Sequence, residues 1–510
     1  MVFTSLAFLV FFLFAWAVYW SLKSSRKAQN VFLLLASYFF YCAAAIPRTN
    51  IPKLILGGRF SEAWQEMTTA VASHQTEVIK LLLLLWLSST FAYLMAKVIE
   101  KTEKQNSRKW LMVLSAVVHL GILCYFKYMN FFAQSFVDIA NTAGWQIAFR
   151  PEHIILPLAI SFFTFHILGY TFDVYQKSYA AATNYIDFIT HVAFFPQLVA
   201  GPIERAGHLL PQFTNSRSFS AERMEDGIRQ ILWGFFKKLV IADSAAKYVN
   251  YVFMQYEDQS GSNIVMAGIM FTIQMYCDFS GYSDIALGTA KLLGFDLLRN
   301  FNFPFFSTSM TDFWRKWHIS LTSWITDYLY TPISFQKRDW GLWGIVYAAI
   351  ISFTLSGLWH GANWPSVLWG LLHGLALGYE VLTKKKRKKW AKQFNPVLYS
   401  VLSGLLVFMF WTFGQLVFRA TSLEHLGGLL AQMASVSLFT LPSLDHTAQA
   451  ALGWAFLMFG IEWFQREKEY GLSIGNLNYM LRWTIYAALI VLIFSSDNLN
   501  NQNEFIYFQF

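Results

Sequence analysis

The chain has little charge for its length. Only 14% of its 510 residues are charged, whereas 55% are hydrophobic and 18% are aromatic. Soluble domains carry about a quarter charged residues, so these are too few to cover a water-facing surface of this size. Uncharged blocks recur along the whole length, and several approach the ~20 apolar residues of a membrane-spanning helix. The sequence therefore predicts an all-α, polytopic integral membrane protein.

Cysteine is also scarce. Cys42, Cys124 and Cys277 lie far apart, within or beside apolar segments. This spacing offers neither a disulfide framework nor paired zinc ligands. A P-loop, a GxSxG elbow and a dinucleotide fingerprint are absent as well. We therefore expect no metal site and no bound cofactor.

The net charge of +9 has a membrane explanation. Basic residues cluster in what we expect to be short loops, above all at Lys384–Lys389 between two apolar blocks. The positive-inside rule places such a run on the cytoplasmic side. Because basic residues are not spread over a polar face with interleaved aromatics, the pattern does not predict nucleic-acid binding.

The ends of the chain alternate regularly between apolar blocks and charge. The predicted N-terminal spans fall within residues 1–130, and the C-terminal spans within 395–510 (3–20, 31–45, 81–96, 110–125; 395–418, 426–438, 447–461, 483–496). Basic residues follow the first block instead of preceding it, so we expect an anchor with an external N-terminus. The polar stretch 48–76 is expected to be an external loop and the C-terminus is also expected outside. The whole chain is predicted to be one membrane domain.

The middle of the chain, about 150–382, is predicted to be the catalytic core and is less regular. Pro157 and Pro196 interrupt apolar segments, and Lys237-Lys238 stand inside the block 231–241. Helix breakers and charges at membrane depth are tolerated where the backbone is buried in protein or lines a wet cavity. We therefore expect short and re-entrant helices around a cavity.

Two histidines are the main candidates for chemistry. His318 lies in the mixed stretch 309–330; if this stretch is helical, Arg315 and His318 share a face. The alternative is an interfacial helix with tryptophan anchors. His360 interrupts the uncharged stretch 342–379, which is long enough for a helical hairpin with His360 at its far turn. A buried neutral imidazole suits a general base, or it holds two helices together.

Several motifs resemble the membrane-bound O-acyltransferase family, specifically its bacterial alginate O-acetyltransferase branch. The resemblance covers nearly the whole chain and rests on these segments: Phe195–Ile203, Tyr276–Asp284, Asn300–Pro304, Asp312–Ser320, Leu358–Gly361 and Tyr507–Phe510. It implies a multi-helix bundle with re-entrant helices around a central tunnel. It also implies a location in the bacterial inner membrane.

The resemblance further implies that a cytoplasmic thioester, acetyl-CoA, is the co-substrate. An extracytoplasmic partner of the SGNH hydrolase type would pass the acetyl group to a polysaccharide. His360 would be the base and His318 the second catalytic residue. The predicted substrate-binding residues come from the same motifs: Gln197, Asp278, Tyr282, Asp284, Asn300, Trp314, Arg315, Trp317, Ser320, Trp359 and Asn363.

Three other functions compete with this one. A lipid acyltransferase and a teichoic-acid D-alanyltransferase belong to the same superfamily, and a polysaccharide export component would not be an enzyme. His166 and the segment after Tyr330 differ from the branch's pattern, so the acceptor polysaccharide stays open.

Overall fold

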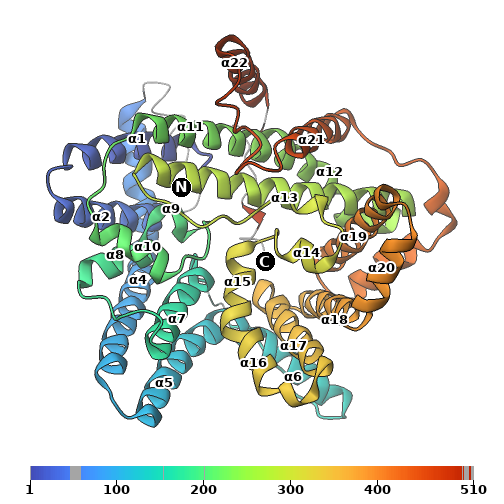
Figure 1. Cartoon of the computed structure of the whole chain (residues 1–510), viewed down its shortest axis with the longest axis horizontal. Coiled ribbons are helices and arrows are strands. Elements are labelled where there is room, and N and C mark those ends of the chain that lie inside the picture. Colours follow the sequence, from blue (N-terminus) through green and yellow to red (C-terminus); the bar gives the residue numbers. More distant parts are fainter. Residues whose placement is uncertain are drawn as a thin grey trace. The chain divides into compact units, whose positions relative to one another are not determined.

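The computed structural model describes residues 2–45, 59–152, 154, 156–199, 201–496, 498 and 505–506. All regular structure in these ranges is helical, which confirms the all-α prediction (Figure 1). The chain forms two compact units: residues 1–227 with 286–298, and residues 228–285 with 299–510. The terminal motif Tyr507–Phe510 and residues 48–58 of the predicted external loop lie outside the described residues.

The first unit contains the N-terminal helices. They are α1 (Leu6–Ser21), α2 (Arg26–Ala45), α4 (Phe60–Lys101), α5 (Gln105–Leu123), the π-helix η1 (Cys124–Tyr128), α6 (Met129–Thr142), α7 (Ile160–Gln176), α8 (Tyr185–Ala193), α9 (Phe195–Leu198) and α10 (Ala206–Thr214). Two further helices contribute residues to both units: α11 (Ala221–Phe235) and α13 (Gly261–Leu292).

The second unit contains the remaining elements. They are η2 (Phe236–Ala242), α12 (Asp243–Met254), η3 (Tyr256–Asp258), η4 (Pro304–Phe306), α14 (Met310–Trp314), α15 (Ile319–Ile325), η5 (Thr326–Tyr330), α16 (Thr331–Gln336), η6 (Arg338–Trp340), α17 (Leu342–His360), α18 (Trp364–Gln393), α19 (Pro396–Arg419), α20 (Leu423–Met433), η7 (Val436–Phe439), α21 (His446–Phe464) and α22 (Tyr479–Ser495).

Among the described residues, six helical segments are long and apolar enough to cross a membrane. They are Arg26–Ala45, Ser73–Lys101, Gln105–Thr142, Gly261–Leu292, Leu342–His360 and Pro396–Arg419. In the Gln105–Thr142 segment only 17% of the most apolar window is buried in the protein. Exposed apolar surface of this kind is stable when it faces lipid.

Three predictions about the spans and the segments beside them are wrong. The span 426–438 is not a membrane helix, because α20 has 11 residues and a helix of that length rises only about 17 Å. The basic run Lys384–Lys389 is not in a loop, because α18 continues to Gln393. Residues from Phe60 onwards, predicted as loop, also form part of α4.

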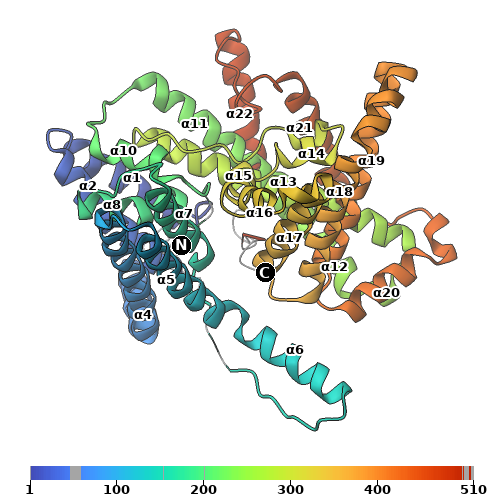
Figure 2. The same ribbon diagram turned by 60° about the horizontal axis from the view of Figure 1, so that its bottom comes forward.

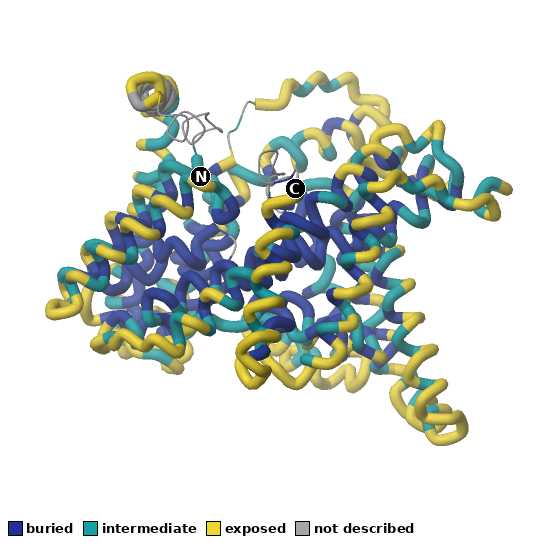
Figure 3. The backbone as a smooth tube through the Cα atoms, turned by 90° about the horizontal axis from the view of Figure 1, so that it is seen from above, coloured by how far each residue is buried: buried dark blue, intermediate teal, exposed yellow. Residues whose placement is uncertain are grey.

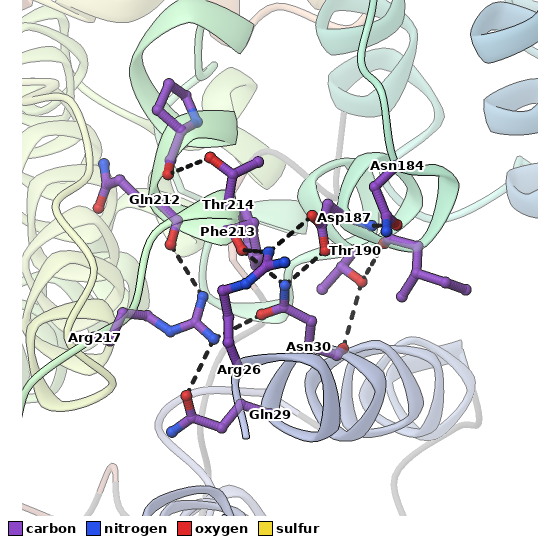
Figure 4. Close-up of polar contacts among 12 residues, drawn as sticks. Arg26, Gln29, Asn30, Asn184, Asp187, Thr190, Gln212, Phe213, Thr214 and Arg217 are labelled. Atoms are coloured by element: carbon purple, nitrogen blue, oxygen red, sulfur yellow. Dashed lines mark hydrogen bonds and ion pairs between the residues drawn. The ribbon is translucent and has the colours of Figure 1, made fainter. Parts of the chain in front are cut away.

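A buried polar network joins α2, α8 and α10 in the first unit (Figure 4). Asp187 accepts hydrogen bonds from Arg26 at 3.0 Å and from Asn30 at 2.7 Å. Both donors also bind the carbonyl oxygen of Phe213 at 2.8 Å. Arg217 donates to the side-chain oxygen of Asn30 at 2.6 Å. These bonds compensate the desolvation of charged groups in the helix contacts.

Aromatic side chains dominate the core of the second unit. Trp411, which is fully buried, packs with tilted rings against Phe313 at a centroid distance of 4.3 Å and against Trp317 at 4.6 Å. Figure 3 shows buried residues grouped in the interior of the units and exposed residues along outer helices. The helices α17 and α18 lie side by side as the predicted hairpin (Figures 1 and 2).

Candidate active site

The segment around His318 is not one helix. It breaks between α14, which ends at Trp314, and α15, which begins at Ile319. His318 has left-handed backbone angles, φ 44° and ψ 51°, and an L-residue in this conformation cannot continue a right-handed helix. As a result Arg315 is exposed while His318 is buried. The predicted common face of Arg315 and His318 is therefore wrong.

Asn300 holds this turn in place. Its carbonyl oxygen accepts a hydrogen bond from the backbone N–H of Ile319 at 2.9 Å. Its side chain donates to Ser283 at 3.0 Å and accepts from the Ser320 hydroxyl at 2.6 Å. A left-handed non-glycine residue costs about 1–3 kcal/mol and persists where its surroundings over-determine it. Such strain is concentrated at functional sites.

The His318 imidazole lies in an aromatic environment. Its ring meets Phe279 edge to face at a centroid distance of 4.6 Å and lies 6.5 Å from the ring of Trp359. His318 lies outside the six candidate membrane spans. Burial lowers its pKa to about 3, so the ring is neutral near pH 7. A neutral imidazole has one N–H donor and one acceptor nitrogen.

His360 is the last residue of α17, directly before the hairpin turn. Glycines let the two helices approach closely: a Cβ added to Gly370 would lie 2.2 Å from the carbonyl oxygen of Phe353, and one added to Gly357 would lie 2.2 Å from that of Ser366. Asn363 caps α18 by accepting a hydrogen bond from the N–H of Ser366 at 2.8 Å. Asn363 was predicted to bind substrate. In the structure its side chain caps a helix.

Trp359 brings the two histidines together. Its ring centroid lies 6.5 Å from that of His318 and 4.6 Å from that of His360. His360 also contacts Trp369 at 5.3 Å and Phe418 at 5.9 Å, both nearly perpendicular to its ring. Both imidazoles therefore lie close to one indole ring, and all three side chains are buried.

Trp314 and Trp317 are part of the packed aromatic core. Trp314 contacts His373 at 5.2 Å and Trp369 at 5.9 Å. Trp317 stacks on Phe313 at 5.7 Å with an interplanar angle of 16°. Both indoles were predicted to bind substrate, and in this structure their rings contact other side chains of the protein.

The predicted residues of α13 face two buried lysines. Lys237 pairs with Asp284 at 2.6 Å, and Lys238 pairs with Asp278 at 2.7 Å. The ammonium group of Lys238 also lies 5.4 Å from the ring centroid of Tyr282. These contacts join η2 to α13 and compensate buried charge. The sequence contained a signal for this pairing. Two lysines interrupt the apolar block 231–241, and two aspartates lie in the Tyr276–Asp284 motif.

Gln197 belongs to the first unit, where it is buried in α9 and donates a hydrogen bond to the carbonyl oxygen of His191.

The residues that sequence reasoning missed are Trp369 and Phe418 around His360, Ser283 beside Asn300, and Glu380, which binds the start of α14. Within the described ranges, no three His, Cys, Asp or Glu residues are grouped so that they could hold a metal ion.

Comparisons with known proteins agree with this architecture. Residues 76–423 match the membrane-bound O-acyltransferase family. A "Probable alginate O-acetylase" of Pseudomonas putida is 31% identical over 532 residues, which cover 100% of both chains. A "Peptidoglycan O-acetyltransferase" of Helicobacter pylori is 32% identical over 73% of this chain and 74% of its own length.

A more distant relative is named for a different activity. A "Teichoic acid D-alanyltransferase" of Bacillus subtilis is 26% identical over 54% of this chain and 71% of its own length. The family match covers more than half of the chain and includes both candidate histidines. The chain therefore belongs to the membrane-bound O-acyltransferase family and is a multi-pass membrane acyltransferase.

Proposed function

We propose that this protein transfers an acetyl group from a cytoplasmic thioester, acetyl-CoA, across the inner membrane for O-acetylation of an extracytoplasmic polysaccharide. The placement of His318 and His360 on one indole carries this proposal. The full-length similarity to an alginate O-acetylase supports the acetyl group and the polysaccharide acceptor. The six candidate spans support a reaction that begins and ends on different sides of a membrane.

In the proposed reaction His360 acts as the general base. It takes the proton from the acceptor hydroxyl while the hydroxyl oxygen forms a bond to the carbonyl carbon of the thioester. His318, which is neutral, donates a hydrogen bond to the carbonyl oxygen as negative charge develops there. The carbon–sulfur bond then breaks, and the thiolate leaves with the proton held by His360. The products are an ester and a free thiol.

The substrate-binding roles of Gln197, Asp278, Tyr282, Asp284, Asn300, Trp314, Arg315, Trp317, Ser320, Trp359 and Asn363 remain part of this proposal. Among these residues, the proposed role of Arg315 follows directly from its exposure. It is exposed, and its guanidinium forms no hydrogen bond or ion pair with the described residues. Its guanidinium is therefore available to an anionic group such as a phosphate of the donor.

The proposal places the N- and C-termini outside and the basic part of α18 in the cytoplasm. An SGNH-type partner outside the membrane would receive the acetyl group and pass it to the polysaccharide. The protein itself would hold no cofactor, because acyl transfer from a thioester needs no redox or metal chemistry.

The test follows labelled acetyl from acetyl-CoA with purified protein, with and without a candidate partner. Wild-type protein is expected to place label on the partner or glycan. His360→Ala is expected to abolish transfer because the hydroxyl then has no base, while His446→Ala, at the exposed start of α21, should retain it. Transfer that survives His360→Ala in a folded protein would contradict the assigned base.

The competing functions give different outcomes in the same assay. Label in the lipid fraction would favour a lipid acyltransferase. Transfer only from a carrier-bound aminoacyl group would favour D-alanylation, the activity for which the 26% identical relative is named. Transport that is insensitive to the loss of both histidines would favour an export component.

A further inference from the structure

A buried carboxylate on α18 binds the start of the segment that carries His318. Glu380 is 9% exposed. One of its oxygens accepts a hydrogen bond from the backbone N–H of Met310 at 2.8 Å. The other accepts from the N–H of Thr311 at 2.9 Å and from the Thr311 hydroxyl at 2.6 Å. Three donors of one short segment thus converge on a single side chain.

These donors are the ones that a helix leaves unpaired. The first N–H groups of α14 have no partner within the helix. Glu380 satisfies two of them, and Ser309 accepts from the third, the N–H of Asp312, at 3.1 Å. A negative charge at a helix N-terminus is stabilised by the helix dipole. Because α14 has only five residues, its position depends on such external contacts.

Arg387 supports the carboxylate from the same helix. Its guanidinium lies 3.5 Å from the Glu380 carboxylate and donates a hydrogen bond to the Glu380 carbonyl oxygen at 2.9 Å. The buried charge of Glu380 is therefore compensated. Arg387 stands inside the basic run Lys384–Lys389, so one member of that run is tied to the protein interior.

The helix α18 contacts both halves of the candidate site. Near its N-terminal end, Trp369 meets His360 at 5.3 Å and Trp314 of α14 at 5.9 Å. Three turns further along, Glu380 binds the first residues of α14. The segment 310–314 is thus held to α18 at both of its ends, and His318 follows four residues later.

We propose that Glu380 is a positioning residue that fixes α14, and through it His318, relative to His360. This inference rests on the proposed catalytic roles of the two histidines. Glu380 contacts backbone groups and a hydroxyl of the protein, so its effect on the reaction is transmitted through the position of α14.

The test compares Glu380→Gln with Asp312→Asn. Each change removes one negative charge, but Asp312 forms a pair with Lys316 at 2.8 Å on a partly exposed surface. In Glu380→Gln we expect kcat for acetyl transfer to fall between about tenfold and a hundredfold, because small displacements of catalytic groups have effects of this size. The KM for the acetyl donor should stay unchanged, because ground-state binding is not altered. Asp312→Asn should keep the wild-type kcat.

A second measurement does not depend on activity. Hydrogen exchange at the Met310 and Thr311 amides should become faster in Glu380→Gln and stay slow in Asp312→Asn. Glu380→Asp keeps the charge and should recover part of kcat if Glu380→Gln folds poorly. A wild-type kcat or unchanged exchange in Glu380→Gln would overturn the positioning role. Wild-type protein that transfers no acetyl would instead overturn the proposed function, while the exchange data would still decide whether Glu380 anchors α14.

Discussion

At the scale of single residues, backbone geometry decides which side chains can take part in chemistry. His318 and Arg315 are three positions apart, yet the left-handed turn at His318 buries the imidazole and leaves the guanidinium exposed. Asn300 stabilises this turn through its backbone and its side chain. Asn300 therefore controls the orientation of His318 without any contact to a substrate being required.

Replacing Asn300 by Ala should lower both stability and activity. Ser283 and Ser320 would each lose the hydrogen bond to Asn300, and a typical hydrogen bond contributes about 0.5–1.5 kcal/mol to stability. We expect a lower Tm in detergent and a decrease in kcat of at least about tenfold. Thermal unfolding and acetyl transfer measure the two effects. Asn141→Ala, which removes two hydrogen bonds to Ile147 at an exposed site, is the matched control and should keep the wild-type kcat.

At the scale of elements, the α17–α18 hairpin positions His360. Its helices pack backbone against backbone because glycines occupy the contact positions, with Gly370 facing Phe353 and Gly357 facing Ser366. A side chain at either glycine would have to push the helices apart. The same hairpin supplies Trp359, Trp369 and Glu380, so its spacing influences both histidines.

Gly370→Ala should reduce activity strongly. The added methyl group would lie 2.2 Å from the carbonyl oxygen of Phe353, and overpacking of this kind costs about 1–3 kcal/mol. We expect a lower Tm and a clear loss of acetyl transfer. Gly453→Ala in α21 is the control, because nothing lies within 4 Å of the added Cβ. It should stabilise the protein by about 0.5–1 kcal/mol through helix propensity. Normal activity of Gly370→Ala would contradict the importance of the close contact.

At the scale of the whole molecule, the apolar surface and the distribution of charge set the relation to the membrane. In the part of the chain that the structure describes, six segments can span a bilayer, and the exposed residues of α19 include Val397, Leu402 and Met409. Such a surface is stable only against lipid. The basic part of α18 directly precedes α19, and the positive-inside rule predicts that such a run lies on the cytoplasmic side.

Cysteine labelling should determine the orientation. In a variant without Cys42, Cys124 and Cys277, we expect Glu62→Cys to react with a membrane-impermeant thiol reagent in spheroplasts, because residue 62 is predicted to lie outside. Lys386→Cys should react only after permeabilisation. Both side chains are exposed in the structure, so burial does not explain a missing reaction. Labelling of Lys386→Cys in sealed spheroplasts would contradict the proposed topology.

Much of the architecture could be predicted from the sequence because hydropathy is a local property. The uncharged stretch 342–379 predicted the hairpin that α17 and α18 form, with His360 directly before its turn. The breakers of the middle region likewise predicted short elements, and α8, α9 and α10 confirm them. Lys237 and Lys238 instead lie in η2, which continues from α11 into α12 without a break. The predicted single domain, the tunnel and the catalytic roles stay predictions.

The amino-acid sequence by itself determined the fold class and the membrane location, and it identified His318 and His360 as candidates. Each of these depends on composition or on a short contiguous motif. Only the tertiary structure decided that Arg315 and His318 separate, that Lys237 and Lys238 pair with Asp284 and Asp278, and that Glu380 binds the start of α14. The two ion pairs and the hydrogen bonds of Glu380 join residues 40 to 70 positions apart. Their formation depends on how helices pack in three dimensions, which local periodicity does not encode.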